Sequence, residues 1–209
     1  MNIKDAYTDW SLTYDVDRNR TRDLDQQIIR EVLAHRRFDR TLEIGCGTGK
    51  NTPFLAGLGG RVVALDFSEG MIERARMKVL HDNVLFVVAD ITQPWPCESG
   101  SIDLVACNLV LEHVQNISFV FGEAFRVLAE GGVLFVSELH PFRQYQGTRA
   151  SFQRGRERTE IQAFVHHLSD FTGAAREQGL SLRDFKEWWH EEDVHKPPRI
   201  ASFVFEKPA

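Results

Sequence analysis

The chain has few cysteines, no long apolar run and no excess of positive charge. Its 209 residues include three cysteines, Cys46, Cys97 and Cys107, and no two of them form a Cys-x-x-Cys pair. This count argues against a disulfide framework and against a cysteine-built zinc site. The apolar runs, such as Val84–Ala89, fall far short of the roughly 20 residues that a membrane helix requires, and Met1–Asp5 lacks the apolar core of a signal peptide. We therefore expect a cytoplasmic protein with reduced cysteines, no metal site and no membrane contact.

The charge balance excludes another class. Thirty acidic residues against twenty-five basic ones give a net charge of −5, which disfavours binding to nucleic acid because such binding needs a basic surface. With 43% hydrophobic and 26% charged residues, the composition is typical of a globular protein. A chain of this length predicts a single domain, as a monomer or a homodimer, with a core large enough to fold without disulfides.

Strand and helix patterns alternate along the first two thirds of the chain. Short apolar runs predict strands at Thr41–Ile44, Arg61–Leu65, Val84–Val88, Ile102–Cys107 and Val133–Ser137. Apolar residues at three- and four-residue spacing predict helices at Thr21–His35, from the cap Ser68 to about Leu80, at Ser118–Ala129 and at Ser169–Gln178, with a short helix near Pro53. This alternation predicts βαβ units and a mostly parallel sheet with helices on both faces. The unbroken apolar run Val84–Val88 predicts a strand covered on both faces.

The pattern changes after the fifth predicted strand. His140–Glu157 shows little periodicity, so we expect a loop or lid there. Its arginines either recognise an anionic ligand or decorate the lid; they are Arg143, Arg149, Arg154 and Arg156, with Arg158 just beyond. Further on, Leu180–Trp189 and Ile200–Glu206 predict a closing pair of strands, with a turn at Lys196–Pro198 between them.

A glycine-rich loop follows the first predicted strand, with glycines at 45, 47 and 49. Glycines at this spacing let the backbone turn sharply and approach a ligand closely, although a tight strand–helix turn would also use them. The dinucleotide-binding fingerprint needs its third glycine one position later, where Lys50 stands. A phosphate-binding loop of the GxxxxGK[ST] type is excluded because Asn51 follows Lys50.

Acidic residues end the next two predicted strands. Asp66 follows the glycine loop by about twenty residues, where a carboxylate can accept hydrogen bonds from both hydroxyls of a ribose. Asp90 ends the third strand, where it can accept from the exocyclic amine of an adenine while the backbone of Ile91 contacts the ring edge. Because the carboxyl ends of parallel strands meet at one edge of the sheet, the three strand ends together predict a nucleoside site.

These motifs together resemble the class I S-adenosylmethionine-dependent methyltransferases, and within them the type 11 methyltransferase domain. Glu43–Gly49 is similar to motif I of that family, Asp103–Val114 to its fourth-strand motif and Arg126–Leu134 to the turn into its fifth strand. The resemblance covers residues 41–138 and, more loosely, 166–179. It implies an α/β fold, a Rossmann-like three-layer sandwich whose seven-stranded sheet has the order 3-2-1-4-5-7-6 with the last inserted strand antiparallel. The predicted closing pair of strands agrees with that order.

The resemblance also implies the cofactor, S-adenosylmethionine, and the residues around it. Glu43 would stabilise the glycine loop or meet the methionine ammonium, Phe67 would lie against the adenine, and Asn108 would lie near the sulfonium. The full set of cofactor-binding residues expected in this way is Glu43, Gly45, Cys46, Gly47, Gly49, Asp66, Phe67, Asp90, Ile91, Asn108 and Leu109.

The acceptor side of such a site is less constrained. Methyl transfer depends mainly on alignment of the reacting atoms, and a general base is needed only where the acceptor has to lose a proton. His140 directly follows the fifth predicted strand, and we expect it to contact the acceptor and to act as the base, since imidazole titrates near neutral pH. His113 lies in an apolar stretch and is expected to pack. The other expected acceptor contacts are Phe142, His166 and His167, together with Tyr14 and Arg22. Tyr14, Asn19 or Arg22 is expected to meet either the methionine carboxylate or the acceptor.

We therefore predict a single-domain methyltransferase that acts on a small-molecule acceptor. Residues 1–35 would form N-terminal cap helices, 41–138 the cofactor-binding core, 139–168 an acceptor-site loop or lid, and 169–209 a closing helix and strand pair. Two alternatives remain: an oxidoreductase that uses a nicotinamide dinucleotide, and a module that binds S-adenosylmethionine without catalysis.

Overall fold

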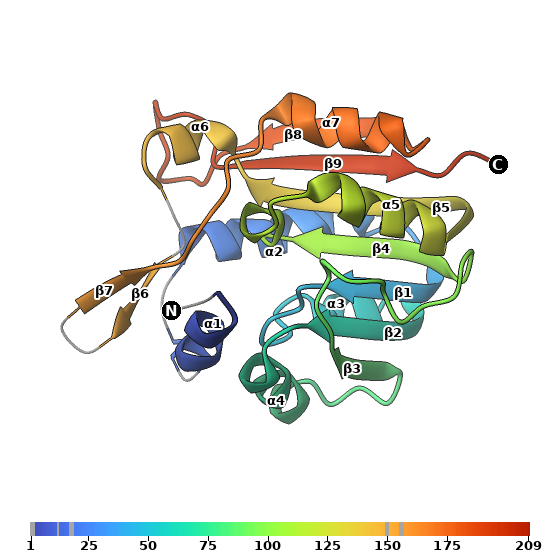
Figure 1. The fold of residues 1–209 in the computed structure, drawn as a ribbon, viewed down its shortest axis with the longest axis horizontal. Helices are drawn as coiled ribbons and strands as arrows, with labels where there is room; N and C mark the ends of the chain where they lie inside the picture. Colours follow the sequence, from blue (N-terminus) through green and yellow to red (C-terminus); the bar gives the residue numbers. More distant parts are fainter. Residues whose placement is uncertain (1–2, 12, 17–18, 149–150, 155–156) are drawn as a thin grey trace.

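The computed structural model describes residues 3–11, 13–16, 19–148, 151–154 and 157–209. In this part of the chain, seven strands form a central sheet and two further strands form a separate hairpin (Figure 1). The strands of the sheet are β1 (Phe38–Ile44), β2 (Gly59–Asp66), β3 (Val84–Val88), β4 (Ile102–Asn108), β5 (Leu128–Leu139), β8 (Ser181–Trp188) and β9 (Ile200–Glu206). The hairpin consists of β6 (Ser151–Arg154) and β7 (Glu157–Glu160).

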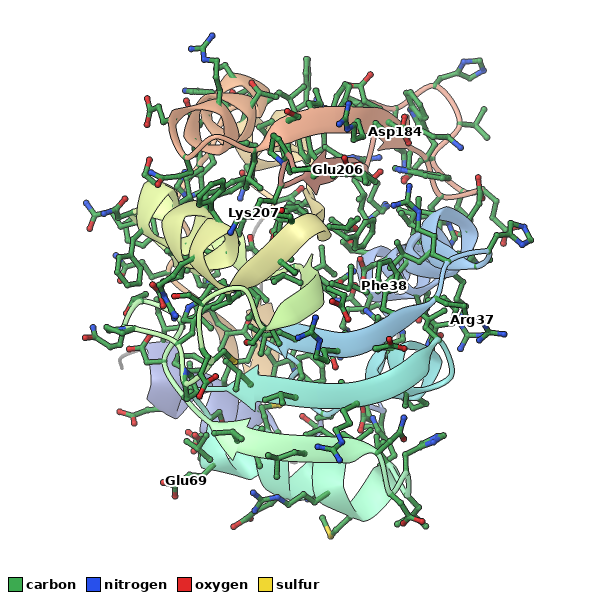
Figure 2. All side chains as sticks on the ribbon, turned by 90° about the vertical axis from the view of Figure 1, so that its right-hand side faces the viewer. Arg37, Phe38, Glu69, Asp184, Glu206 and Lys207 are labelled. Carbon is green, nitrogen blue, oxygen red and sulfur yellow. The ribbon has the colours of Figure 1, made fainter. Side chains whose placement is uncertain are left out.

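The order across the sheet is β3-β2-β1-β4-β5-β9-β8. Neighbouring strands from β3 to β5 pair in parallel, whereas β9 is antiparallel to both β5 and β8. Counted within this sheet alone, the order is 3-2-1-4-5-7-6, so the predicted topology is confirmed. Figure 2 shows the molecule from the right-hand side of Figure 1. Phe38 at the start of β1 and Glu206 at the end of β9 both lie on this side, as strands that run in opposite directions require.

Helices cover both faces of the sheet, which confirms the three-layer arrangement (Figures 1 and 2). One face carries α2 (Arg20–Leu33), α3 (Thr52–Ala56) and α4 (Glu69–Lys78), and the other carries α5 (Ile117–Val127) and α7 (Leu168–Glu177). The first face is filled by side chains such as Ile28, Leu55 and Phe135, and the second by Phe121, Phe171 and Phe203. These side chains are almost wholly buried, so the sheet is held rigidly between its helices.

Polar caps fix where two of these helices begin. The side-chain oxygen of Asn19 accepts hydrogen bonds from the backbone N–H groups of Thr21 and Arg22 at the start of α2. The hydroxyl of Ser68 accepts from the backbone N–H of Met71 at the start of α4, as the sequence indicates. Such caps satisfy N–H groups that have no partner inside the helix.

β3 departs from its prediction. It lies at the edge of the sheet, and Leu85 and Val88 are 59% and 41% exposed. Within the strand only Phe86 is buried. The expected coverage on both faces is therefore wrong, because an apolar run does not reveal whether its strand lies at the centre or at the edge of a sheet.

The segment predicted as a loop or lid contains regular structure. It forms the short helix α6 (Pro141–Tyr145) and the β6–β7 hairpin. The helix predicted from Ser169 begins at Leu168, and the backbone N–H of the preceding His167 donates to the Asp170 carboxylate at 2.7 Å. Arg149 and Arg156 lie outside the described residues.

The first helix, α1 (Ile3–Trp10), lies beyond the carboxyl ends of the parallel strands (Figure 1). Ala6 and Trp10 pack against Ile161, just after the hairpin. On the other side, the hydroxyls of Thr8 and Ser68 lie 3.0 Å apart, which joins α1 to the start of α4. The helix is thus held at the edge of the sheet where parallel α/β sheets bind ligands.

Candidate active site

A cavity of about 250 Å³ opens at the carboxyl ends of β1, β2, β3 and β4. The expected cofactor residues that line it are Glu43, Gly45, Cys46, Gly47, Asp66, Phe67, Asp90, Ile91, Asn108 and Leu109. Gly49 is not among the lining residues. We refer to this space as the first cavity.

The glycines of the loop after β1 serve different purposes. Gly45 and Gly47 have φ values of +66° and +54°, a region that favours glycine. A Cβ on Gly45 would lie 2.2 Å from Cγ2 of Val110, whereas at Gly47 no described atom lies within 4 Å. Gly47 therefore leaves its backbone open to a ligand in the first cavity. At Gly49, which also has a positive φ, a Cβ would lie 2.9 Å from Cγ2 of Val79, the residue after α4.

Asp66 connects β2 to the glycine loop. Its Oδ2 accepts from the backbone N–H of Gly47 at 2.9 Å, and its Oδ1 accepts from that of Ser68 at 2.8 Å. Burial raises the pKa of Asp66 to about 6, although these two hydrogen bonds oppose the rise. A carboxylate offers about four lone-pair sites, so Asp66 retains acceptor capacity for a ribose hydroxyl.

Glu43 lies at the floor of the first cavity, where its side chain is buried. Its Oε2 accepts from the hydroxyl of Thr52 at 2.6 Å. Burial raises the pKa of Glu43 to about 8; the bond from Thr52 opposes this, and the nearby Asp25 and Asp66 add to it. A cationic group in the cavity would relieve this cost of burying a carboxylate.

Asp25 joins this site without having been expected there. The Nδ2 groups of Asn51 and Asn108 donate to its two carboxylate oxygens at 2.9 and 2.7 Å. The buried Oδ1 atoms of both amides meet no donor in the described part of the chain. Together with the carboxylate of Glu43, these acceptors suit an ammonium group. The sequence holds one signal for this position, since Asp25 lies three residues before Ile28 on the buried stripe of α2.

A second cavity, of about 460 Å³, adjoins the first. The four residues that line both are Tyr7, Tyr14, Arg22 and Leu109. The guanidinium of Arg22 stacks on the ring of Tyr14 at 4.0 Å, and its Nη1 donates to the Tyr14 carbonyl oxygen at 2.6 Å. The second cavity is further lined by Trp10, Asn19, Arg20, Thr21, Glu112, Leu139, Thr148 and Arg199. The second cavity is thus lined by both aromatic and polar residues, and the four shared residues lie between it and the first cavity.

Sequence reasoning also missed a pair of residues at this wall. Tyr7 Oη and His113 Nε2 lie 2.7 Å apart, and both residues line the first cavity. His113 was expected to pack within an apolar stretch, but its ring faces the cavity. No sequence pattern relates the two residues, because they are 106 positions apart in the chain.

His140 does not line either cavity, in contrast to the expectation that it would contact the acceptor. Its Nε2 lies 2.8 Å from Oε1 of Glu187 on β8, and its Nδ1 accepts from the backbone N–H of Phe142 at 3.1 Å. Burial lowers the pKa of His140, against the opposing effect of Glu187. The antiparallel β9, inserted beside β5, brings β8 and Glu187 close enough to hold the ring there. The expectation that His140 acts as the base is therefore wrong, because its ring lies outside both cavities.

The other late residues also lie away from both cavities. His166 is buried with Nε2 2.7 Å from the Val114 carbonyl oxygen, and His167 bonds through Nδ1 to the Tyr145 hydroxyl. Phe142 is 48% exposed. Arg143, expected in a lid, is buried and donates to the carbonyl oxygens of Pro197 and Pro198 and to Asp193. Of the expected acceptor residues, the structure thus brings only Tyr14, Arg22 and Asn19 to the second cavity.

The comparisons with known proteins agree with this geometry. A family model described as "Methyltransferase domain" matches residues 42–136. Residues 42–136 therefore form a methyltransferase domain. This family resemblance was expected from the motifs and is confirmed.

Individual relatives differ in how much they share with this chain. It is 30% identical over 158 residues to a ubiquinone biosynthesis O-methyltransferase of Xanthomonas axonopodis pv. citri. The aligned part covers 69% of this chain and 64% of that protein. The chain spans between 34% and 64% of the length of the curated relatives it matches.

Solved structures confirm the fold. An S-adenosylmethionine-dependent methyltransferase from Mesorhizobium loti superposes with a TM-score of 0.72 at 18% identity, covering 86% of this chain and 96% of that one. The N-methyltransferase NodS from Bradyrhizobium japonicum, in complex with S-adenosylhomocysteine, gives 0.68 at 20% identity, covering 92% and 90%.

Within the described ranges, no helix is long and apolar enough to cross a membrane, and no group of three or more His, Cys, Asp or Glu residues is arranged to hold a metal ion.

Proposed function

We propose that this methyltransferase binds S-adenosylmethionine in the first cavity and transfers its methyl group to a small molecule in the second. The observation that carries the proposal is that the two cavities share four lining residues, so that a nucleoside-type site lies directly beside a second space. The names of the ubiquinone biosynthesis O-methyltransferase and of NodS, crystallised with S-adenosylhomocysteine, support a small acceptor and this cofactor.

The residues of the first cavity fit the parts of the cofactor. Asp66 would accept from the ribose hydroxyls, Asp90 and the backbone of Ile91 would meet the adenine, and Phe67 would lie against the ring. At the other end, the carboxylate of Glu43 and the amide oxygens of Asn51 and Asn108 would accept hydrogen bonds from the methionine ammonium. Asp25 holds the two amides in place by accepting from their Nδ2 groups. The bound cofactor supplies an activated methyl group on a sulfonium.

The protein contributes mainly position and shielding. Alignment of nucleophile, methyl carbon and sulfur can contribute several kcal/mol, up to about 7–11 in well-oriented systems. Tyr7 and Trp10 on α1 form walls of the second cavity, and Tyr7 also walls the first. The helix thereby shields the reacting atoms from water.

We further propose that the chain is one domain that acts in a reducing cytoplasm without binding nucleic acid. The three cysteines are all free, and the net charge is −5.

Calorimetric titration with S-adenosylhomocysteine, with NAD as the comparison ligand, tests the proposed function. We expect micromolar binding of S-adenosylhomocysteine and none of NAD. Binding of NAD alone would instead support the oxidoreductase, and binding of neither ligand would contradict the assignment of the first cavity.

A further inference from the structure

Tyr7 and His113 meet where the two cavities join, and neither has yet been given a chemical role. Tyr7 lines both cavities, and His113 lines the first. Their side chains are joined by the 2.7 Å contact between Tyr7 Oη and His113 Nε2, and the rings pack edge to face with centroids 5.3 Å apart. Tyr7 is one of the four residues between which a methyl group would pass from the first cavity to the second. The inference drawn from the pair therefore rests on the proposed function.

A second contact fixes the tautomer of His113. Its Nδ1 lies 2.9 Å from the carbonyl oxygen of Gln162, which can only accept a hydrogen bond. In the neutral ring Nδ1 therefore carries the proton, and Nε2 accepts from the hydroxyl of Tyr7. The Tyr7 oxygen keeps its lone pairs for a ligand.

Glu112 lies beside the Tyr7–His113 pair. Its Oε1 lies 3.6 Å from Nε2 of His113. Burial raises the pKa of Tyr7 well above its usual value, so the phenol stays neutral and passes a proton on rather than ionising. The titratable groups that act on Tyr7 come from four other places in the fold and are Tyr14, Glu112, Asp66 and Glu138.

We propose that Tyr7 and His113 form a proton relay that removes the proton from an acceptor hydroxyl, which makes this chain an O-methyltransferase. A neutral amine attacks a methyl group with its own lone pair and needs no base beforehand, whereas an alcohol or phenol has to lose its proton. Of the residues that line both cavities, Tyr7 is the one that contacts a histidine. An imidazole is the side chain best suited to accept a proton near neutral pH.

The transfer balances as follows for atoms and charge. The acceptor oxygen forms a bond to the methyl carbon while the methyl–sulfur bond breaks, and the electron pair of that bond remains on sulfur. The hydroxyl proton moves to Oη of Tyr7 as the original Tyr7 proton moves to Nε2 of His113. The products are a methyl ether, S-adenosylhomocysteine and a protonated His113, so the positive charge of the sulfonium ends on the imidazole.

The test uses sinefungin, in which a carbon bearing an ammonium group replaces the methylated sulfur of the cofactor. That ammonium lies where the methyl group would be, and it can donate to Oη of Tyr7. We expect Tyr7→Phe to weaken sinefungin binding by about fivefold or more, the effect of one lost hydrogen bond, while S-adenosylhomocysteine binding changes by less than about twofold. An unchanged ratio of the two affinities in Tyr7→Phe would overturn the relay.

The chain offers a matched control, since Tyr145 also contacts a histidine, His167, and neither of these residues lines a cavity. Tyr145→Phe should leave both affinities unchanged. If the wild type fails to bind S-adenosylhomocysteine, the proposed function itself is wrong. If it binds S-adenosylhomocysteine but the ratio of the two affinities is the same in Tyr7→Phe as in the wild type, only the relay is wrong.

A second variant gives a readout that holds even if Tyr7→Phe does not fold. His113→Asn removes the imidazole that orients the Tyr7 hydroxyl, so the affinity of sinefungin relative to S-adenosylhomocysteine should fall in this variant as well. His167→Asn, the matched change at the control pair, should leave the ratio unchanged. An unchanged ratio in a folded His113→Asn variant would contradict the relay.

Discussion

Three buried carboxyl groups, those of Glu43, Asp66 and Glu138, have raised pKa values. Burial raises the pKa of Glu43 and of Glu138 to about 8 and that of Asp66 to about 6. Glu138 accepts from the backbone N–H groups of Val110 and Leu111, both at 2.8 Å, and so fixes the turn after β4. Because the folded protein holds these protons more tightly than the unfolded chain does, protonation of these groups favours folding.

The first prediction concerns Glu43 and the stability of the ligand-free protein. Its pKa rises from 4.5 to about 8 on folding, so the stabilisation is complete below pH 4.5 and is lost as the pH rises toward 8. We expect the unfolding midpoint to fall over this range, and to fall less steeply in Glu43→Gln, as measured by calorimetry at a series of pH values. Glu73→Gln, an exposed site on α4, should keep the wild-type slope. Equal slopes in Glu43→Gln and the wild type would show that Glu43 is not protonated on folding.

The second prediction concerns Asp66 and the ribose. Asp66→Ala should reduce the affinity for S-adenosylhomocysteine by about 1–3 kcal/mol, or about 5- to 150-fold, because hydrogen bonds to a buried carboxylate are lost. Titration calorimetry measures the change, and Asp82→Asn on the exposed surface is the control. Since Asp66 also holds the N–H of Gly47, circular dichroism should verify that the variant is folded. Unchanged affinity in a folded variant would remove the ribose assignment.

The acidic ends of strands could be predicted because a strand, a turn and a carboxylate are local in the chain. Asp66 and Asp90 both line the first cavity, as their positions predicted. The contact between Tyr7 and His113, by contrast, depends on how α1 folds back across the sheet. The placement of His140 depends on β9, which is inserted between β5 and β8. Neither arrangement leaves a local trace in the sequence.

Among the elements, α1 matters most to the site. It is joined to α4 through Thr8 and Ser68, and to the segment after the hairpin through Trp10 and Ile161. It packs on the edge of the molecule rather than within the layers of the sheet (Figure 1). Its removal should therefore affect ligand binding more than folding.

The third prediction is the removal of residues 1–18. The cut falls before Asn19, so the cap of α2 is retained. We expect the affinity for S-adenosylhomocysteine to fall at least tenfold, since the walls that Ile3, Tyr7 and Tyr14 contribute are lost, while the far-UV circular dichroism retains the signal of the α/β core. Wild-type affinity in the shortened chain would show that α1 does not cover the cofactor.

Elements were predictable where the sequence alternates clearly between strand and helix periods. β4 and α5, for example, lie within about two residues of their predicted bounds. The β6–β7 hairpin was missed because its strands are rich in charged and polar residues, so the sequence shows no apolar period there.

At the scale of the whole molecule, the C-terminal strand β9 completes the core between the sheet and the helices α5 and α7. Phe203 on β9 stacks on Phe171 of α7 with centroids 5.2 Å apart, and on Phe205 at 5.7 Å. Phe205 in turn packs edge to face on Phe121 of α5. This cluster fixes β9 and β8 at their end of the sheet.

The fourth prediction separates stability from binding through this cluster. Phe203→Ala should lower the free energy of unfolding by about 3–5 kcal/mol, as is typical for a buried phenylalanine, when measured by urea denaturation. Phe185→Ala, whose ring touches Phe203 but is 40% exposed, should cost clearly less. Both variants, where folded, should bind S-adenosylhomocysteine as the wild type does, because neither residue lines the first cavity. A similar loss in both variants would contradict the burial of this cluster.

A single helix provides walls to both cavities, since Ile3 and Tyr7 of α1 face the first and Tyr7 and Trp10 the second. Under the proposed function, α1 would have to move whenever spent cofactor is exchanged for fresh cofactor, and the same movement would open the second cavity. We therefore expect an acceptor with two methylatable hydroxyls to be released after each transfer, so that its singly methylated form accumulates before the doubly methylated one. Methylation would then be distributive rather than processive, as a consequence of where the eight residues of α1 lie.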